Sequence, residues 1–264
     1  MHPIERLRFV ARATGAPVDD VVHEAAASLA GFSSDPVSLV TACRRLLDRH
    51  AAIGPVWWLC ARTLLAPDPG DEAWRCHAAH HSDPTAAELT HALPEGARVV
   101  VVGWPDRLGA VLVPRGDLEV LVVDVAGDGP GFARALERAD VPVHDVAPTA
   151  MAAAVAAADL VLLESALVGP EVLVAASGSW EVAAVARSAE VPVWVLGGLG
   201  TTMGSGLWPA ARRRLEAPGR PPWEADRSFV PLDLVDRVAG PQGLRRVPDA
   251  LATVDVPDVA ELRR

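Results

Sequence analysis

The chain has 264 residues, of which 50% are hydrophobic and 22% are charged, and this balance predicts a folded protein with a sizeable core. Its formal net charge of −10 disfavours nucleic acid as a partner, because an acidic surface repels phosphate backbones, although a small phosphorylated ligand fits a local positive pocket. The apolar runs stop short of the about 18 residues that a membrane-spanning helix needs, and the three cysteines form no CxxC pair, so we expect a cytoplasmic protein without a membrane anchor.

The basic side chains have an unusual composition. The chain contains no Lys, Asn or Tyr, so that Arg supplies every positive charge apart from His. These three residue types have AT-rich codons, and their absence suggests a GC-rich bacterial genome. The physical consequence is that no Lys can form a Schiff base or contact a phosphate.

Residues 1–96 are predicted to form a helical subdomain. Ile4 and Leu7 fall on one face of a first helix. Later helix starts are indicated by N-cap residues and by Pro at the first helical position, at Asp19 or Asp20, Asp35-Pro36, Pro55 and Asp83-Pro84. We expect Asp68-Pro69-Gly70 to break the fourth helix, and Pro94-Glu95-Gly96 to form the turn that ends the subdomain.

Residues 97–264 show a different pattern, in which runs of β-branched and other apolar residues alternate with helical stretches. The apolar runs predict strands at residues 98–104, 118–125, 141–146, 159–164 and 191–196. Strands that alternate with helices form βαβ units with parallel pairing. We therefore expect an α/β fold, in which a Rossmann-like parallel sheet with helices on both faces follows the helical subdomain.

Several polar or aromatic residues are expected at the carboxyl ends of these strands, where parallel sheets bind their ligands. Gly103 and Trp104 end the first strand, Asp124 ends the second, and Ser165 follows the fourth. Trp104 is suited to stack on a base or sugar, or alternatively to act as a hydrophobic lid. Arg107 is suited to clamp a phosphate, or alternatively to be a solvated residue at a helix start.

A second candidate site is Ser177-Gly178-Ser179, which leads into a predicted helix. Free backbone N–H groups and the helix dipole make such a start an anion site, although an ordinary N-cap by Ser177 or Ser179 explains the same residues. The Gly-rich residues 197–206 resemble a phosphate cradle in composition only, because they lack the GxxxxGK[ST] pattern. We interpret them as a mobile lid over the site.

No cofactor and no metal are expected. A nicotinamide or flavin site is disfavoured because the first strand is not followed by GxGxxG. His77 and His81 would share a helical face close to Cys76, but they lack a second cluster of ligands and an HExxH pattern. We interpret these histidines as residues of a helix surface.

Several segments follow one another in an order that resembles a known family. They are IGPVWWLCARTLL at 53–65, VVVVGWPDRLGAVL at 99–112, DLVLLESALVGP at 159–170, Gly-Ser-Trp at 178–180 and SFVPLDLVDRVAGPQG at 228–243. The series resembles the family that joins the regulatory subunits of eukaryotic translation initiation factor 2B to the ribose-1,5-bisphosphate and methylthioribose-1-phosphate isomerases. The resemblance implies the fold described above, a phosphorylated small molecule as ligand, and a symmetric homodimer.

The residues on which the isomerases of that family depend are replaced in this chain. Ala166 stands where the resemblance implies an Asp, Gly103-Trp104-Pro105 where it implies a Cys, and Ala175-Ala176 where it implies Asn-Lys. The first hypothesis is therefore a diverged pseudoenzyme that binds a phosphorylated sugar or nucleotide. The second is an active aldose–ketose isomerase of sugar phosphates that uses replacement residues, with Glu164 and Asp124 as candidates. The third is a scaffold that only dimerises with a partner of the same family and binds no small molecule.

Overall fold

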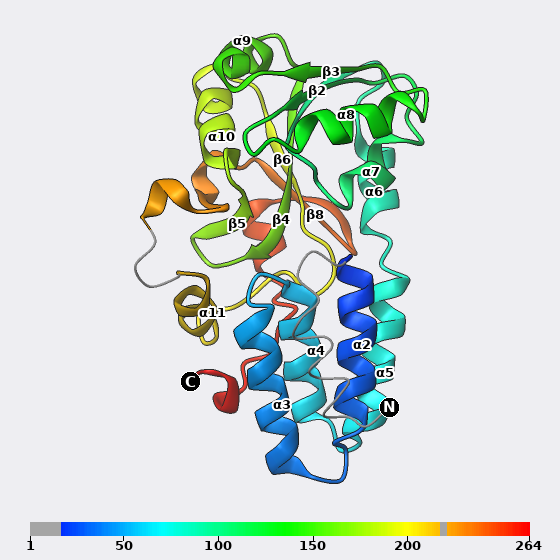
Figure 1. Cartoon of the computed structure of the whole chain (residues 1–264), viewed down its shortest axis with the longest axis vertical. Helices are drawn as coiled ribbons and strands as arrows, with labels where there is room; N and C mark the ends of the chain where they lie inside the picture. Colours follow the sequence, from blue (N-terminus) through cyan, green and yellow to red (C-terminus); the bar gives the residue numbers. More distant parts are fainter. Residues whose placement is uncertain (1–16, 217–220) are drawn as a thin grey trace.

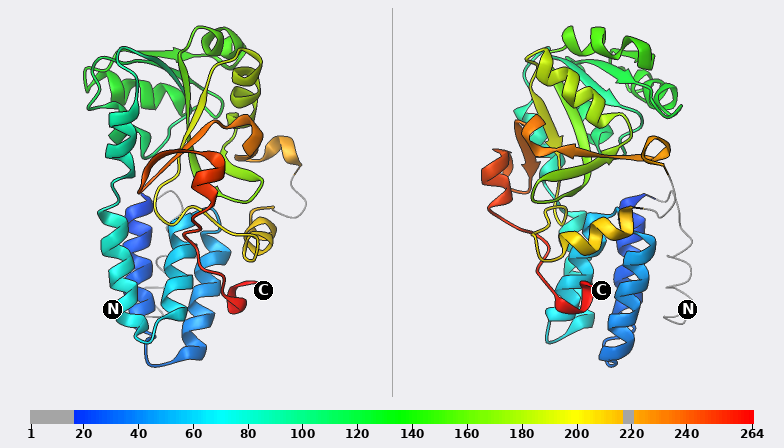
Figure 2. Two further views of the ribbon diagram at one scale, coloured as in Figure 1. Left: turned by 180° about the vertical axis from the view of Figure 1, so that it is seen from behind. Right: turned by 90° about the vertical axis from the view of Figure 1, so that its left-hand side faces the viewer.

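The computed structural model describes residues 17–216 and 221–264, which form a helical layer below an α/β layer (Figure 1). The first helix that the sequence predicts, with Ile4 and Leu7, lies outside the described residues. The chain enters the α/β layer after the helices, and its C-terminal end returns to the helical layer (Figures 1 and 2).

Five helices open the described chain, namely α2 (Val18–Ala30), α3 (Pro36–Arg49), α4 (Gly54–Leu65), α5 (Pro69–His81) and α6 (Thr85–Ala92). The first four form the helical layer, in which Trp57 is fully buried. The Asp35 side chain accepts the backbone N–H of Ser38 at 3.1 Å and caps α3 as predicted. Asp68 accepts the N–H of Asp71 at 3.0 Å in the same way, so the Asp-Pro pair that separates two helices also begins α5.

The main sheet confirms the predicted Rossmann-like α/β fold. Its strands are β1 (Arg98–Val102), β2 (Glu119–Val123), β3 (Val143–Val146), β4 (Leu160–Val168), β6 (Val193–Leu196), β8 (Arg237–Gly240) and β9 (Gly243–Arg246). They lie in the order β3-β2-β1-β4-β6-β8-β9, and all neighbours pair in parallel except β8 and β9. The carboxyl ends of β1, β4 and β6 therefore meet at one edge.

Strand β4 is longer than the sequence predicts. It continues past Glu164, with an irregularity in register between Ser165 and Leu167, and then pairs antiparallel with β5 (Val172–Ala176). A further strand, β7 (Arg227–Pro231), pairs antiparallel with β5. This three-stranded extension brings residues from β5 and β7 to the carboxyl edge of the main sheet.

The two faces of the main sheet pack against different helices. Val99 and Val101 of β1 belong to a core with α6, α7 (Leu108–Leu112) and α8 (Gly129–Glu137). Val100 and Val102 belong to a core with α9 (Met151–Ala156), α10 (Ser179–Ser188) and α12 (Val247–Leu251). Because both faces are buried, the strands have continuous β-branched runs and not an alternating pattern.

The helical layer is completed by residues from the second half of the chain. Trp208 of α11 (Trp208–Leu215), together with Val256 and Leu262, joins the same core as Trp57. Conversely, Leu89 of α6 belongs to the core that Val99 and Val101 form on one face of the sheet. Each layer therefore contains residues from the half of the chain that builds the other layer, and these contacts fix the relative position of the two layers.

The Gly-rich residues 197–206 form a packed connection between the two layers. The backbone N–H of Leu199 donates to the Asp83 carboxylate at 2.7 Å. The N–H groups of Gly200 and Thr202 both donate to the Asp255 carboxylate, each at 3.2 Å. This arrangement differs from the mobile lid that the composition suggests, because two carboxylates distant in sequence hold the loop against the protein.

Candidate functional site

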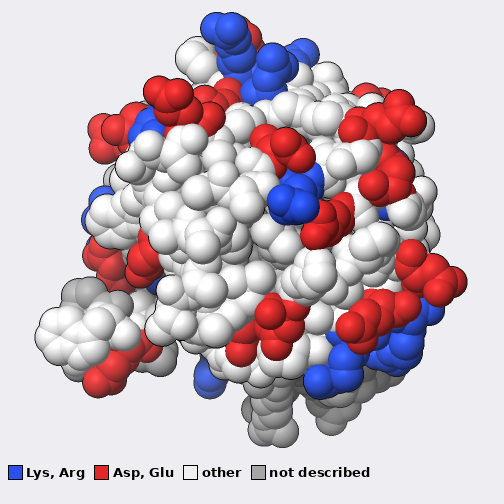
Figure 3. Space-filling model, turned by 90° about the horizontal axis from the view of Figure 1, so that it is seen from above, with Lys and Arg blue, Asp and Glu red and all other residues white. Residues whose placement is uncertain are grey.

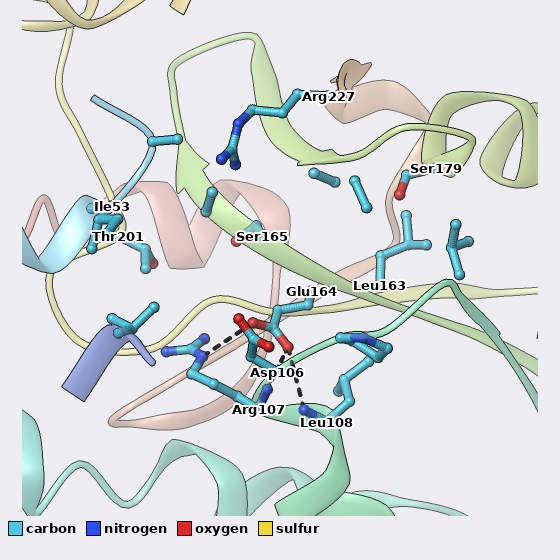
Figure 4. Close-up of a pocket in the computed structure, with 18 of the residues that line it drawn as sticks. Ile53, Asp106, Arg107, Leu108, Leu163, Glu164, Ser165, Ser179, Thr201 and Arg227 are labelled. Atoms are coloured by element: carbon cyan, nitrogen blue, oxygen red, sulfur yellow. Dashed lines mark hydrogen bonds and ion pairs between the residues drawn. The ribbon is translucent and has the colours of Figure 1, made fainter. Parts of the chain in front are cut away.

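A cavity of about 330 Å³ lies at the carboxyl edge of the main sheet, where the sheet faces the start of α4 (Figure 4). Its volume is at the lower end of the range for small-molecule sites. Its polar lining comes from the loop after β1, from β4, from the start of α10, from the loop after β6, and from the start of β7 with the residue before it. These polar residues are Asp106, Arg107, Glu164, Ser165, Ser179, Thr201, Asp226 and Arg227.

Glu164 lies at the base of the cavity and is tied to the loop after β1 (Figure 4). Its Oε2 atom accepts the backbone N–H of Arg107 at 2.8 Å and that of Leu108 at 3.3 Å. Burial raises the pKa of the Glu164 carboxyl above its ordinary value, while the positive charge of Arg107 opposes that rise. The charge of Asp106 adds to the rise, so Glu164 holds a proton more readily than a solvated Glu does.

Arg107 is already engaged by acceptors of the protein. Its Nε atom lies 3.7 Å from Glu164 Oε1, and its Nη2 atom donates to the carbonyl oxygen of Gly197. The predicted alternatives for Arg107 were a phosphate clamp and a solvated side chain. The side chain is 23% exposed, lines the cavity and lies beside the Glu164 carboxyl group.

Ser165 and Ala166 line the cavity next to Glu164 on β4. Ser165 is buried, and its hydroxyl donates to the carbonyl oxygen of Leu196 at 3.4 Å. The start of α4 approaches closely here, since a Cβ atom on Gly54 would lie 2.8 Å from the carbonyl oxygen of Ala166. The helical layer therefore closes one side of the cavity at the position where the resemblance implies an isomerase Asp.

One residue of the predicted Ser177-Gly178-Ser179 site, Ser179, lines the cavity. Ser177 and Gly178 form the turn that leads into it. Gly178 is the N-cap of α10 with a φ of 88°, and no side chain caps this helix. The ordinary N-cap by Ser177 or Ser179 is therefore not formed. Ser179 is 2% exposed, and no hydrogen bond of its hydroxyl is found among the described residues.

Arg227 was missed by the sequence prediction. It lies on β7 opposite Ala176 of β5, lines the cavity, and extends its side chain toward the interior of the site (Figure 4). Within residues 17–216 and 221–264, no ion pair of its guanidinium is found. The sequence around Arg227 shows no helical or strand periodicity that is long enough to predict β7. It therefore gives no sign that this segment pairs with β5 at the edge of the sheet.

Trp104 and Gly103 occupy different parts of the β1 end. Trp104 lines the cavity and is 47% exposed, with its ring centroid 5.9 Å from that of Phe132. Gly103 does not line the cavity. It has a φ of 60°, and a Cβ atom there would lie 2.8 Å from Asp128 Oδ1, so it turns the chain where a side chain has no room.

Asp124 holds a turn after β2 and does not line the cavity. Its Oδ1 atom accepts the backbone N–H of Gly127 at 2.7 Å and that of Gly129 at 3.1 Å. A carboxylate that satisfies two backbone N–H groups shapes its own loop. Glu164 and Asp124 are therefore not brought together at one site.

The surface histidines lie on the helical layer, away from the cavity. His23 Nδ1 and His77 Nε2 are 3.2 Å apart, and His77 stacks on His81 with ring centroids 6.3 Å apart. In the part of the chain that the structure describes, no group of three or more His, Cys, Asp or Glu side chains is placed to hold a metal ion. None of the described helices is long and apolar enough to cross a bilayer.

Comparisons with solved structures confirm the fold that the sequence resemblance predicts. Translation initiation factor eIF-2B from Pyrococcus horikoshii OT3 matches with a TM-score of 0.74 and 10% identity, over 94% of this chain and 98% of that one. The eIF2B-beta2-delta2 complex from C. thermophilum matches at 0.74 and 16%, over 95% and 92%. 5-Methylthioribose 1-phosphate isomerase from P. horikoshii OT3 matches at 0.64 and 14%, over 93% and 85%. No protein-family model matches the chain, and no curated protein matches it significantly.

Proposed function

We propose that this chain is a diverged protein of the eIF2B-like fold that binds a phosphorylated sugar or nucleotide in the cavity and has lost isomerase chemistry. The observation that carries the proposal is Ala166. It lines the cavity at the position where the resemblance implies the Asp of an isomerase. A methyl group can neither donate nor accept a proton, and none of the described residues that line the cavity is a Cys.

The start of α10 and Arg227 support a phosphate as part of the ligand. The first backbone N–H groups of α10 carry the positive end of the helix dipole, and Ser179 adds a hydroxyl that faces the cavity. Arg227 adds a guanidinium, which suits a phosphate in geometry and charge. Ser177 and Gly178 precede Ser179 in this turn, and Ser165 and Arg107 also line the cavity.

One observation favours an active isomerase as the alternative function. Glu164 lies in the cavity, and burial raises the pKa of its carboxyl, as catalytic acids and bases require. Asp106 also lines the cavity and contributes to that rise. In this alternative, Glu164 transfers the proton between the two carbons of an aldose phosphate, without help from Asp124.

A time course of ³¹P NMR spectra separates the two functions. The purified protein is mixed with ribose 1,5-bisphosphate, methylthioribose 1-phosphate or ribose 5-phosphate. The proposed function predicts no conversion of any of the three. Conversion by the wild type that is lost in Glu164→Gln and kept in Glu137→Gln, an exposed control on α8, would establish the alternative.

We also propose that the chain forms a homodimer. Residues 146–158, which include α9, contain no charged side chain, and Figure 3 shows a broad uncharged surface on the end of the molecule that carries α9. An exposed surface without charge is suited to pack against a second copy. Sedimentation equilibrium at micromolar concentration tests this, and a monomer would contradict it.

We propose a cytoplasmic location for the protein. Cys43, Cys60 and Cys76 are free thiols buried in the helical layer, which fits a reducing compartment. Fractionation of the source cells, with detection by an antibody, tests the location.

A further inference from the structure

We infer that Trp104 is a platform for the base of a nucleotide, so that the ligand of this cavity is a nucleoside phosphate and not a sugar phosphate without a base. The inference rests on the phosphorylated ligand proposed above. It concerns the part of the cavity lining that Trp104 provides.

The Trp104 indole is accessible from the cavity. Trp104 is 47% exposed although it lines the cavity. A hydrophobic lid, the other interpretation of this residue, would bury its ring against the opposite wall. An indole that lines a cavity while half exposed leaves aromatic surface available to a planar ligand group, and base–aromatic stacking is a common source of affinity for nucleotides.

The first turn of α8 holds the Trp104 indole in a fixed position. The Phe132 ring lies 5.9 Å from the Trp104 ring at an angle of 51°. A Cβ atom on Gly131 would lie 2.7 Å from Trp104 Cζ3, so only Gly leaves room for the indole here. The six-membered edge of the ring is therefore held by the first turn of α8. A ring fixed in this way needs little ordering when a base stacks on it.

The ends of β1 and β2 relate Trp104 to the start of α10. Val102 of β1 pairs with Val123 of β2, so Trp104 and Val125 follow neighbouring strands, which lie about 4.8 Å apart. Val125 in turn contacts Gly178, where an added Cβ would clash with the Val125 side chain. Val125 thus connects the segment after β2 with Gly178, which directly precedes Ser179. In the inferred complex the base lies on Trp104 and the phosphate at Ser179, both of which line the cavity.

The chemistry of the cavity wall near Trp104 also favours a base. Val102, Pro105, Leu108 and Leu162 supply apolar lining there. The hydroxyls of a bare sugar would lose their hydrogen bonds to water against these side chains, whereas the faces of a base would not. The cavity therefore combines aromatic and apolar lining with Ser179 and Arg227, which suit a phosphate, and this combination matches a nucleoside monophosphate.

Calorimetric titration tests the inference with AMP, GMP, UMP and CMP as nucleotides and ribose 5-phosphate as the base-free probe. For the wild type we expect at least one nucleotide to bind tenfold or more tightly than ribose 5-phosphate. Trp104→Ala should bring that ratio close to one, and Trp104→Phe should keep part of it. Trp74→Ala, which removes a similarly exposed indole from α5, should leave the ratio unchanged.

The outcomes separate this inference from the proposed function. If ribose 5-phosphate binds as tightly as every nucleotide, or if Trp104→Ala leaves the ratio unchanged, the nucleotide inference is overturned while the phosphorylated ligand stands. If none of the five compounds binds, both proposals fail. Circular dichroism of Trp104→Phe and Trp104→Ala shows whether each variant is folded, and the Phe variant serves if the Ala variant is not.

Discussion

The Glu164 carboxylate accepts the backbone N–H of Arg107 at 2.8 Å, so a residue in the middle of β4 caps the first turn of α7 from inside the cavity. The Arg107 guanidinium lies beside the same carboxylate, with Nε 3.7 Å from Oε1. The Glu164 carboxylate thus already occupies the backbone N–H groups and the guanidinium with which the loop after β1 could bind an anionic ligand. This relationship favours Arg227 over Arg107 as the phosphate contact in the proposed site.

Replacement of Glu164 by Gln should change how the stability of the protein depends on pH. The pKa of Glu164 is raised in the folded state, chiefly by burial, so the folded protein holds this proton more tightly than the unfolded chain does. Its contribution to stability is complete below about pH 4.3, the ordinary Glu pKa, and declines as the pH rises through the folded pKa. Gln does not titrate, so the wild type should lose stability relative to Glu164→Gln over this range.

Thermal unfolding of the two proteins between about pH 4 and about pH 8 measures this difference. Glu137→Gln on α8 is the control, because Glu137 is exposed and does not line the cavity. A wild type that gains stability over Glu164→Gln as the pH rises would show that the Arg107 charge outweighs burial, contrary to the expectation.

Replacement of Gly178 by Ala should destabilise the protein and displace the start of α10. Gly178 has a φ of 88°, and its Cβ atom would overlap the Val125 side chain. The left-handed conformation alone costs a non-Gly residue about 1–2 kcal/mol, and the overlap adds to this cost. Urea unfolding measures the loss. Gly116→Ala is a matched control, since an added Cβ would meet nothing within 4 Å and Gly116 has no positive φ, and an equal loss in both variants would refute the argument.

The strands of the main sheet could be predicted from the sequence because both of their faces are buried. Val99, Val100 and Val101 form one apolar run, and each contacts a core on one side or the other of the sheet. The end of β4 could not be predicted in this way. A strand was expected to stop at Glu164, but the chain continues with irregular register into a hairpin with β5, and that pairing depends on contacts distant in sequence.

The candidate site was predictable to the extent that it is built from strand ends. Trp104, Arg107, Glu164 and Ser165 follow β-branched runs, and the parallel topology brings them to one cavity. Arg227 could not be found, because its position depends on β7 pairing with β5. Asp124 stands at a strand end too, but its carboxylate bonds to its own loop, which the sequence pattern of a strand end does not reveal.

Replacement of Arg227 by Ala should weaken the binding of phosphorylated ligands. Arg227 lines the cavity together with Ser179, and its loss removes a charge that a phosphate would contact. We expect the Kd for the ligand that binds most tightly to rise about tenfold, which corresponds to about 1.4 kcal/mol. Arg246→Ala removes an exposed Arg from β9 and should leave the Kd unchanged.

Thermal-shift measurements with sugar phosphates and nucleoside monophosphates extend this comparison to the scaffold hypothesis. A ligand that binds only the folded state raises the unfolding temperature, and the rise grows with the ratio of ligand concentration to Kd. A rise in the wild type that is smaller in Arg227→Ala would exclude a protein that only dimerises. The absence of any rise with every compound would instead favour the scaffold.

Hydrogen exchange should show that residues 197–206 are held in place and do not open as a lid. The N–H groups of Gly200 and Thr202 donate to one carboxylate of Asp255, and burial raises the pKa of that carboxyl above its ordinary value. In the wild type these amides should therefore exchange slowly.

Asp255→Ala should increase their exchange rates by about tenfold or more. A tenfold increase requires the free energy of local opening to fall by only about 1.4 kcal/mol. Asp249→Ala, an exposed change on α12, should leave them protected. Fast exchange of both amides in the wild type would restore the lid interpretation.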